Sequence, residues 1–194
     1  MFGGNMLDRI IKEATDAVSA AIKGAGDIVG AVTTTVKDQV VNIISGTGDV
    51  ANSTVEAASS VASGSAKAAG TVGTSLTETI SGTMSGVVNG VSSIGGDIMH
   101  SVFGAAQGIV KGTAETGGDV GKAAVSAVEG AIKAAGDVGA DVAEAAKSAV
   151  GGAINAATSA GTNVAGTVKN ALLSSAALPR DVIESAVKGS EEKK

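Results

Sequence analysis

The sequence predicts an all-α protein with no β-sheet, built from a repeated amphipathic helix. An eleven-residue pattern runs from residue 5 to about residue 173, with repeats beginning at residues such as Asp16, Asp27 and Asp38. Eleven residues make three helical turns at about 3.67 residues per turn. Positions 2, 3, 6, 7 and 10 of each repeat are apolar or small, and they fall within an arc of about 130°, as one face of a helix requires. Among the charged residues of this stretch, only Lys169 lies at one of those positions.

Interruptions of the pattern preserve its phase. Residues 93–96 and 159–162 each insert four residues, and the repeat that begins at Gly130 is four residues short. Because four residues are about one helical turn, each slip rotates the apolar stripe by only about 30–40°. The preserved phase favours a nearly continuous helix, with kinks at the Gly-Gly pairs 95–96, 117–118 and 151–152.

A coarser pattern predicts a competing architecture, a stack of short helices folded into helical hairpins. Glycine followed by aspartate can end one helix and then cap the next. Tetrads of this kind recur at spacings of 18, 22 or 26 residues. They are residues 24–27, 46–49, 68–71, 94–97, 116–119, 134–137 and 160–163.

Three segments are expected along the chain. Residues 1–23 form an N-terminal amphipathic anchor helix with Asn5 as its N-cap, or alternatively a first core helix. Residues 24–173 form the repeat region. Pro179 ends the long pattern because it has no backbone N–H for the helix. Residues 174–194 then hold a short helix and a charged, solvated tail.

Composition argues against several classes of function. The 194 residues include 29 Gly and two Phe but no Trp, Tyr or Cys, so no disulfide, thiolate nucleophile or Cys-ligated metal is expected. The net charge of −5 and the lack of a basic stripe argue against nucleic acid and weaken attraction to anionic membranes. No run approaches 18 apolar residues, and residues 1–12 lack a secretory signal pattern. We therefore expect a cytoplasmic or peripheral protein.

Candidate catalytic and cofactor sites are weak. Residues 46–51 match a glycine-rich dinucleotide fingerprint superficially, without the βαβ context and later acidic residue that it needs. His100 is the single histidine, and one imidazole alone forms neither a triad nor a metal site. Aspartates eleven residues apart lie about 16 Å from one another on a helix, too far to share a metal or a proton. We predict no enzyme activity, cofactor, metal or small-molecule substrate.

The apolar stripe needs a partner. Interior glycines cost roughly 0.8–1 kcal/mol each in helix stability, so a lone helix would not persist in water. Either a lipid surface or further copies of the chain in a homo-oligomer could cover the stripe, and small residues let helices approach closely. Most glycines fall on the polar side of the repeat or its borders, which favours lipid. The scarcity of cations there favours neutral lipid droplets or bilayers with packing defects.

The residues predicted to form this lipid-facing or core surface lie at the apolar positions of the repeat, except Val41, which lies at position 4. They are Met6, Leu7, Ile10, Ile11, Val18, Ile22, Ile28, Val29, Val32, Val40, Val41, Ile43, Ile44, Val72, Leu76, Val87, Val88, Ile98, Met99, Val102, Phe103, Ile109, Val110, Val138, Val142, Ile154, Val164, Val168 and Leu172.

A resemblance points to the same function. Residues 31–50 (AVTTTVKDQVVNIISGTGDV) and 108–128 (GIVKGTAETGGDVGKAAVSAV) resemble the eleven-residue repeat region of perilipins, the coat proteins of lipid droplets. Synucleins, apolipoproteins and phasin-like granule coats are more distantly similar. The resemblance implies a non-enzymatic peripheral coat on a lipid droplet, granule or membrane. The alternative function is a self-assembling structural protein whose repeat helices bundle into a fibre, tube or scaffold.

Overall fold

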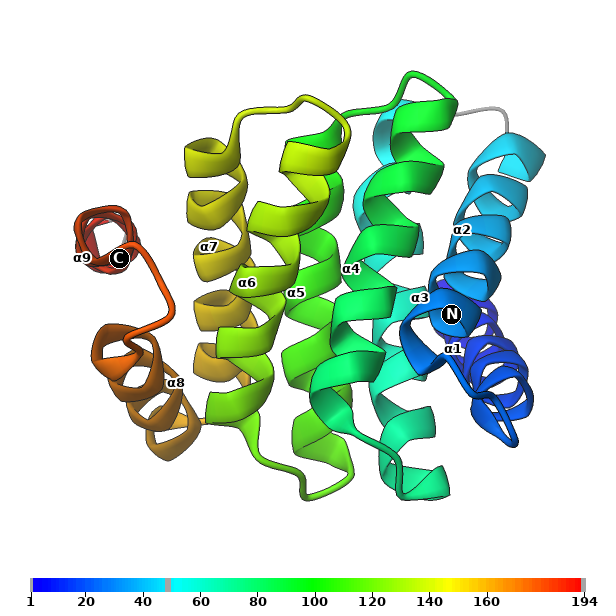
Figure 1. The fold of residues 1–194 in the computed structure, drawn as a ribbon, viewed down its shortest axis with the longest axis horizontal. Helices are drawn as coiled ribbons and strands as arrows, with labels where there is room; N and C mark the ends of the chain where they lie inside the picture. Colours follow the sequence, from blue (N-terminus) through cyan, green and yellow to red (C-terminus); the bar gives the residue numbers. More distant parts are fainter. Residues whose placement is uncertain (1, 48–49, 193–194) are drawn as a thin grey trace.

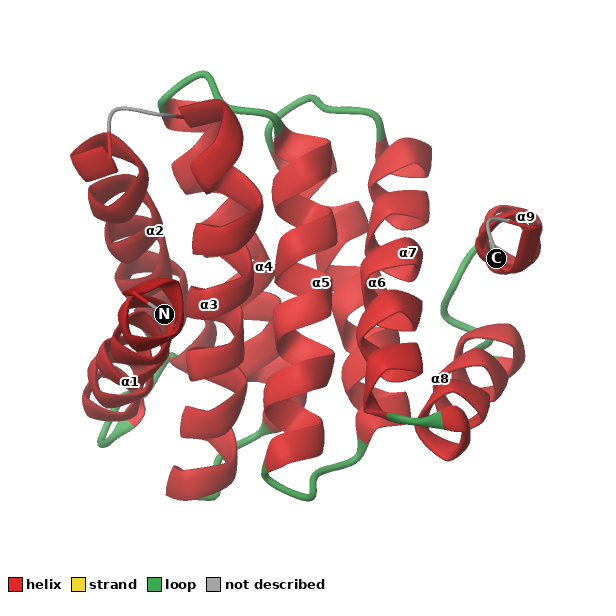
Figure 2. Cartoon of the chain, turned by 180° about the vertical axis from the view of Figure 1, so that it is seen from behind, coloured by secondary structure: helices red, strands yellow, loops and turns green. Residues whose placement is uncertain are grey.

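The computed structural model describes residues 2–47 and 50–192, and within these residues the chain forms nine α-helices and no strand (Figures 1 and 2). The all-α prediction is therefore confirmed. The helices are α1 Phe2–Ile22, α2 Ile28–Thr47, α3 Val50–Val72, α4 Leu76–Ser93, α5 Ile98–Glu115, α6 Val120–Asp137, α7 Val142–Ala160, α8 Thr162–Ser174 and α9 Arg180–Glu192.

The helices stack into a two-layer solenoid. The odd helices α1, α3, α5 and α7 form one layer, and the even helices α2, α4, α6 and α8 form the other (Figure 1). Because the chain reverses at each turn, helices of one layer run parallel. Each helix packs mainly against the adjacent helix of its own layer, which lies two helices away along the chain. The two ends of the chain lie at opposite ends of the stack. The nearly continuous helix is thus wrong, and the helical hairpins are right.

From Gly73 onward, the turns recur every 22 residues. Positive φ angles mark Gly73, Gly95, Gly117, Gly139 and Gly161, a left-handed conformation that commonly ends a helix. Two consecutive eleven-residue repeats therefore make one helix and one turn. In a stack of such units the apolar stripe must recur at a constant phase, as it does along a continuous helix. The preserved phase of the stripe is therefore compatible with both architectures.

The turn after α4 illustrates the local chemistry. Gly95 has a φ of 70°, and the Gly96 N–H donates to the Val91 carbonyl at 2.9 Å, which closes the end of α4. The Asp97 carboxylate then accepts the His100 N–H at 3.1 Å and caps α5. These paired signals end one helix and begin the next within four residues.

Two predicted turns are misplaced. Residues 68–71 lie inside α3 and residues 134–137 inside the end of α6. The chain turns instead at Gly73 and Gly139, because the residues two positions later, Ser75 and Asp141, accept backbone N–H groups of the next helix. The tetrads at 24–27, 94–97, 116–119 and 160–163 coincide with turns, whereas residues 48–49 of the remaining tetrad lie outside the described residues.

Other local predictions are corrected too. Asn5 lies within α1, which extends back to Phe2, and so does not cap that helix. The Gly-Gly pairs 95–96 and 117–118 are turns between helices rather than kinks. The pair 151–152 lies inside α7, where both glycines serve packing instead.

Many glycines of the predicted polar side are buried. Gly104, Gly108 and Gly112 follow one another at four-residue spacing on α5 and face the backbone of α3. A Cβ added to Gly104 would lie 2.5 Å from the carbonyl oxygen of Val55. The interpretation of these glycines as solvent-side residues is wrong, because a helix in a solenoid contacts neighbours in its own layer as well as in the other layer.

The even layer repeats this arrangement. Gly82, Gly86 and Gly90 of α4 face α2, and a Cβ on Gly86 would lie 2.8 Å from the Cβ of Val36. Between the two layers the core is filled by Val, Ile and Ala side chains together with Met84. We refer below to such rows of small residues, four apart and pressed against the preceding helix of a layer, as small-residue ridges.

The first helix of each layer lacks a small-residue ridge. At the places where α4 carries Gly82, Gly86 and Gly90, counted from the N-cap, α2 carries the exposed residues Thr34, Asp38 and Asn42. On α1, the exposed residues Lys12 and Asp16 form an ion pair at 3.5 Å. Polar outer faces on terminal units are a regular feature of repeat proteins, because the last face has no neighbour to cover it.

Candidate binding groove

The residues predicted to face lipid lie mainly inside the solenoid. Thirteen of them are buried: Val18, Ile22, Val32, Val40, Ile44, Val87, Val88, Val102, Ile109, Val110, Ile154, Val168 and Leu172. Fourteen are half-buried: Leu7, Ile10, Ile11, Ile28, Val29, Val41, Ile43, Val72, Leu76, Ile98, Met99, Phe103, Val138 and Val164. Only Met6 and Val142 of this set are exposed, at 57% and 44%. The set is brought together as a core shared among helices rather than as one continuous outer face.

His100 has a structural role. Its backbone N–H and its ring Nδ1 both contact the Asp97 carboxylate, the ring at 2.7 Å. The backbone hydrogen bond and then the ring hydrogen bond lower the pKa of Asp97 below its ordinary value of 3.8. The pair caps α5 at an exposed position.

Among residues 2–47 and 50–192, no group of three or more His, Asp or Glu side chains is placed to hold a metal ion. None of the helices described is long and apolar enough to cross a membrane. The dinucleotide-like stretch at residues 46–51 falls partly outside the described residues, and its Gly46 belongs to α2.

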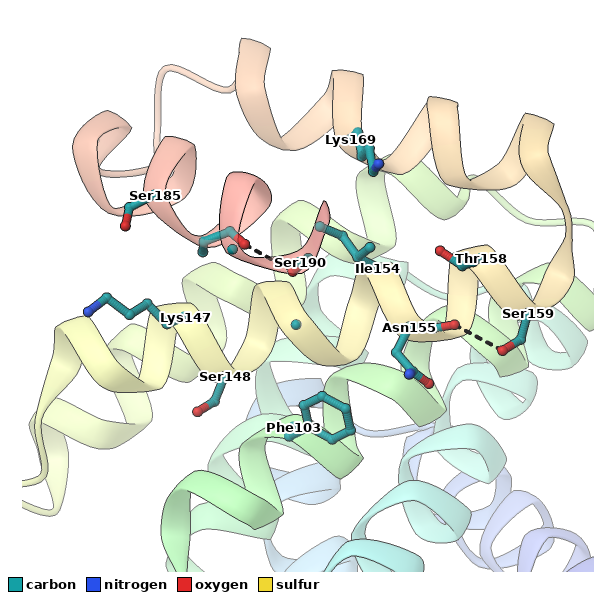
Figure 3. Close-up of a pocket in the computed structure, with 13 residues that line it drawn as sticks. Phe103, Lys147, Ser148, Ile154, Asn155, Thr158, Ser159, Lys169, Ser185 and Ser190 are labelled. Atoms are coloured by element: carbon teal, nitrogen blue, oxygen red, sulfur yellow. Dashed lines mark hydrogen bonds between the residues drawn. The ribbon is translucent and has the colours of Figure 1, made fainter. Parts of the chain in front are cut away.

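A groove of about 750 Å³ lies beside α7 at the C-terminal end of the stack (Figure 3). Phe103 of α5 lies on one side of α7, and α8 and α9 close the groove from the other. Its apolar lining comes from Phe103, Ile154, Ala186 and the backbone of Gly151 and Gly189. The rim is polar, with Lys147, Ser148, Asn155, Thr158, Ser159, Lys169, Ser185 and Ser190.

Several rim groups already have partners in the chain. Asn155 accepts a hydrogen bond from the Gln107 side chain at 2.8 Å, and Ser159 donates to the Asn155 carbonyl at 3.0 Å. Lys147 pairs with Glu144 at 3.1 Å, and Lys169 pairs with Glu191 at 2.9 Å. The lining contains no Asp, Glu or His. It offers an apolar floor and a polar rim whose two lysines are paired with carboxylates, a combination typical of ligand-binding sites.

The groove was not predicted from the sequence, although Phe103, Gly151, Ile154 and Lys169 of its lining were noted for other reasons. Phe103 is one of two phenylalanines in the chain, and Gly151–Gly152 was predicted to be a kink. In the structure, Gly152 presses on the Phe103 carbonyl of α5, while a Cβ on Gly151 would lie 3.5 Å from the Phe103 ring. The signal available in sequence was this glycine pair beside a rare aromatic residue.

No protein-family model matches the sequence, and no curated protein matches it. Among solved structures, the fold is similar to that of the de novo designed helical repeat protein DHR7, with a TM-score of 0.53 and 15% sequence identity. The alignment covers 96% of this chain and 98% of that chain. At this identity the similarity concerns the fold alone, which is that of a helical repeat protein. The resemblance to lipid-droplet coat proteins stays a prediction.

Proposed function

We propose that the protein is a non-enzymatic structural scaffold, a preassembled helical solenoid that binds a macromolecular partner through its surface. The observation that supports this proposal is that the interior helices α4, α5 and α7 are covered on two sides. Their apolar stripes are covered by the other layer, and their small-residue ridges are covered by the preceding helix of their own layer. Because these apolar and small-residue faces are buried within the chain, the helices can form without lipid.

The two ends of the stack support a discrete particle over an open-ended fibre. At one end, α1 and α2 place Lys12, Asp16 and Asp38 where a further helix would require small residues. At the other end, α9 lies across the stack and is held by the buried side chains of Ile183 and Val187. Assembly of several copies would have to use a lateral surface instead.

Circular dichroism combined with light scattering tests the proposal. We expect full helicity in buffer without lipid, independent of concentration, with a mass that fits one chain or a small fixed number of chains. Neutral-lipid emulsion should leave the spectrum unchanged. A low helicity that rises sharply only on adding the emulsion would contradict the scaffold and support a coat that folds on lipid.

Attachment to lipid through α1 is a second candidate, favoured by one observation. Met6 is 57% exposed, and Leu7, Ile10 and Ile11 are only half-buried, so α1 keeps an apolar edge. Such an edge can enter a bilayer interface. The test is flotation with uncharged liposomes, in which Met6→Asp should abolish flotation while Val142→Asp, at the other exposed apolar residue of the predicted lipid-facing set, should not. Equal flotation of both variants would exclude α1 as the anchor.

A further inference from the structure

The odd layer contains a repeated seat for a helix. On α5, Phe103 and Gln107 lie six and ten residues after the N-cap, Asp97, and they receive Gly152 of α7. A Cβ on Gly152 would lie 3.2 Å from the backbone nitrogen of Gln107. Val55, Ser59 and Ser63 of α3 receive the ridge of α5 in the same way. Each seat is a row of residues four apart that accepts a small-residue ridge from a parallel helix.

The corresponding row on α7 lines the groove. Six, ten and fourteen residues after its N-cap, Asp141, α7 carries Lys147, Gly151 and Asn155, and all three border the groove. The preceding helix α5 reaches the edge of this row, where the Phe103 ring lies 3.5 Å from the Cβ position of Gly151 and Gln107 donates to Asn155. Among the described residues, no further parallel helix follows α7 in the odd layer to cover the row. The helix α9 crosses the stack instead, seen end-on in Figure 1 where α7 is seen from the side.

The helix α9 fills little of the groove that it borders. Its groove-lining residues are Ser185, Ala186, Gly189 and Ser190, all with small side chains. The side chains of Ile183 and Val187 point into the core and hold α9 in place. The seat on α7 is therefore left partly empty while α9 stays anchored beside it.

We infer that this groove is the docking site for one helix of a partner protein. Its occupant carries Gly, Ala or Ser at four-residue spacing along the contacting edge, as α5 and α7 do in the preceding seats. Acidic residues flank that edge and exchange with Glu144 and Glu191, which pair with the rim residues Lys147 and Lys169 in the free chain. This inference rests on the proposed scaffold function and specifies the partner's chemistry. The groove continues an interface that the chain already uses twice.

A second copy of the chain is a poor occupant. The ridges Gly82–Gly86–Gly90 and Gly104–Gly108–Gly112 are pressed against α2 and α3, and the free edges of α1 and α2 carry charged residues. A second copy could free either of these ridges only by unfolding. We therefore assign the helix to a different protein, in the helix-in-groove mode of recognition.

The probe is a fluorescein-labelled peptide of residues 141–160, stapled on the face opposite Ser148, Gly152 and Ala156. This segment seats on α5 within the chain, so its ridge fits the seat repeated on α7. Fluorescence anisotropy with the full protein should give saturable binding. The same peptide with Gly152→Leu should bind at least tenfold more weakly, because its ridge is blocked.

Protein variants locate the binding. Gly151→Leu should weaken binding at least tenfold by filling the groove, whereas Gly166→Leu, a helical glycine with nothing near its Cβ position, should leave binding unchanged. Lys147→Glu should weaken binding to a peptide with added acidic flanks. Circular dichroism of each variant establishes that it is folded.

Three outcomes overturn the inference. They are no saturable binding by the wild-type protein, equal binding by Gly151→Leu, and equal binding of the blocked peptide. Displacement of the peptide by neutral liposomes would assign the groove to lipid and overturn it as well. A protein that is fully helical and discrete in buffer but fails to bind the peptide would leave the scaffold function intact, which separates the two proposals.

Discussion

Asp38 of α2 and Gly86 of α4 occupy the same place in successive helices of one layer, each eleven residues after the N-cap, Asp27 or Ser75. Gly86 lies against α2, with its Cβ position 2.8 Å from the Cβ of Val36, whereas Asp38 is exposed. A glycine allows the next stacking contact, and an aspartate at the same place ends the layer. The residue at this place, glycine or aspartate, thus distinguishes an interior helix of the layer from its terminal helix.

Removing this polar end should make the solenoid associate. The triple variant Thr34→Ser, Asp38→Gly, Asn42→Ala gives α2 the residues that α6 carries at the same places, Ser126, Gly130 and Ala134. We expect its mass, measured by sedimentation, to rise with concentration. Asp137→Asn removes a charge near the end of α6 and is the control, with an unchanged mass. A triple variant whose mass does not depend on concentration would show that Asp38 does not limit the stack.

Helix capping should contribute measurably to stability. The Asp119 carboxylate accepts the Lys122 N–H at 2.9 Å, so Asp119→Ala should lower the free energy of unfolding by about 0.5–2 kcal/mol. Asp119→Asn keeps an acceptor and should lose much less. Urea denaturation measures both, with Asp16→Ala as the exposed control. Equal losses in Asp119→Ala and Asp16→Ala would refute the capping role.

The cap of α5 should make stability depend on pH. The pKa of Asp97 is lower in the folded chain than its ordinary value of 3.8 because the carboxylate accepts hydrogen bonds from His100. Because the folded-state pKa is lowered, the ionised carboxylate of Asp97 stabilises the fold above about pH 4. This stabilisation is lost as the pH falls through the folded-state pKa. The stability difference between the wild-type protein and Asp97→Asn should therefore shrink on acidification below pH 4. Parallel stability curves across that range would contradict this assignment.

The C-terminal helix should open independently of the stack. Ile183 is 1% exposed and anchors α9, and truncation of a buried Ile costs about 2–5 kcal/mol. In Ile183→Ala, amide hydrogens of α9 should exchange much faster, while those of α3 to α6 keep their wild-type rates. Ser185→Ala, on the exposed side of α9, is the control. Faster exchange throughout the chain would mean that α9 is part of one cooperative unit.

The sequence contained enough information to predict the helices and their inward faces, because charged residues avoid the apolar arc so completely. It was ambiguous about the turns. Thr71 follows Gly70 and suggests a turn, yet the turn falls at Gly73 because Ser75 caps the next helix. Asp137 follows Gly136 in the same way, but it pairs with Lys133 at 2.9 Å within α6. Local signals of similar strength compete, and tertiary packing decides between them.

The groove was beyond prediction for a different reason. It exists because α9 crosses the stack instead of continuing it, and that orientation depends on how the segment around Pro179 directs the chain. The buried glycines were misinterpreted because one amphipathic helix has two faces, whereas a solenoid helix has neighbours on three sides. Gly108 looks solvent-facing on a helical wheel, yet it meets the Ser59 backbone.

A pair of Gly→Ala substitutions tests the central claim, that close helix packing within the chain creates the fold. Alanine stabilises an exposed helical position by about 0.4–1 kcal/mol relative to glycine. Gly166 has nothing near its Cβ position, whereas a Cβ on Gly108 would overlap the Ser59 carbonyl, and overpacking costs about 1–3 kcal/mol.

The measurement is the free energy of unfolding of Gly108→Ala and Gly166→Ala in urea without lipid. We predict opposite signs: Gly108→Ala is destabilised and Gly166→Ala is stabilised. If the helix formed only on a lipid surface, both Gly→Ala substitutions would increase its stability. Stabilisation of both variants would therefore contradict the packed solenoid.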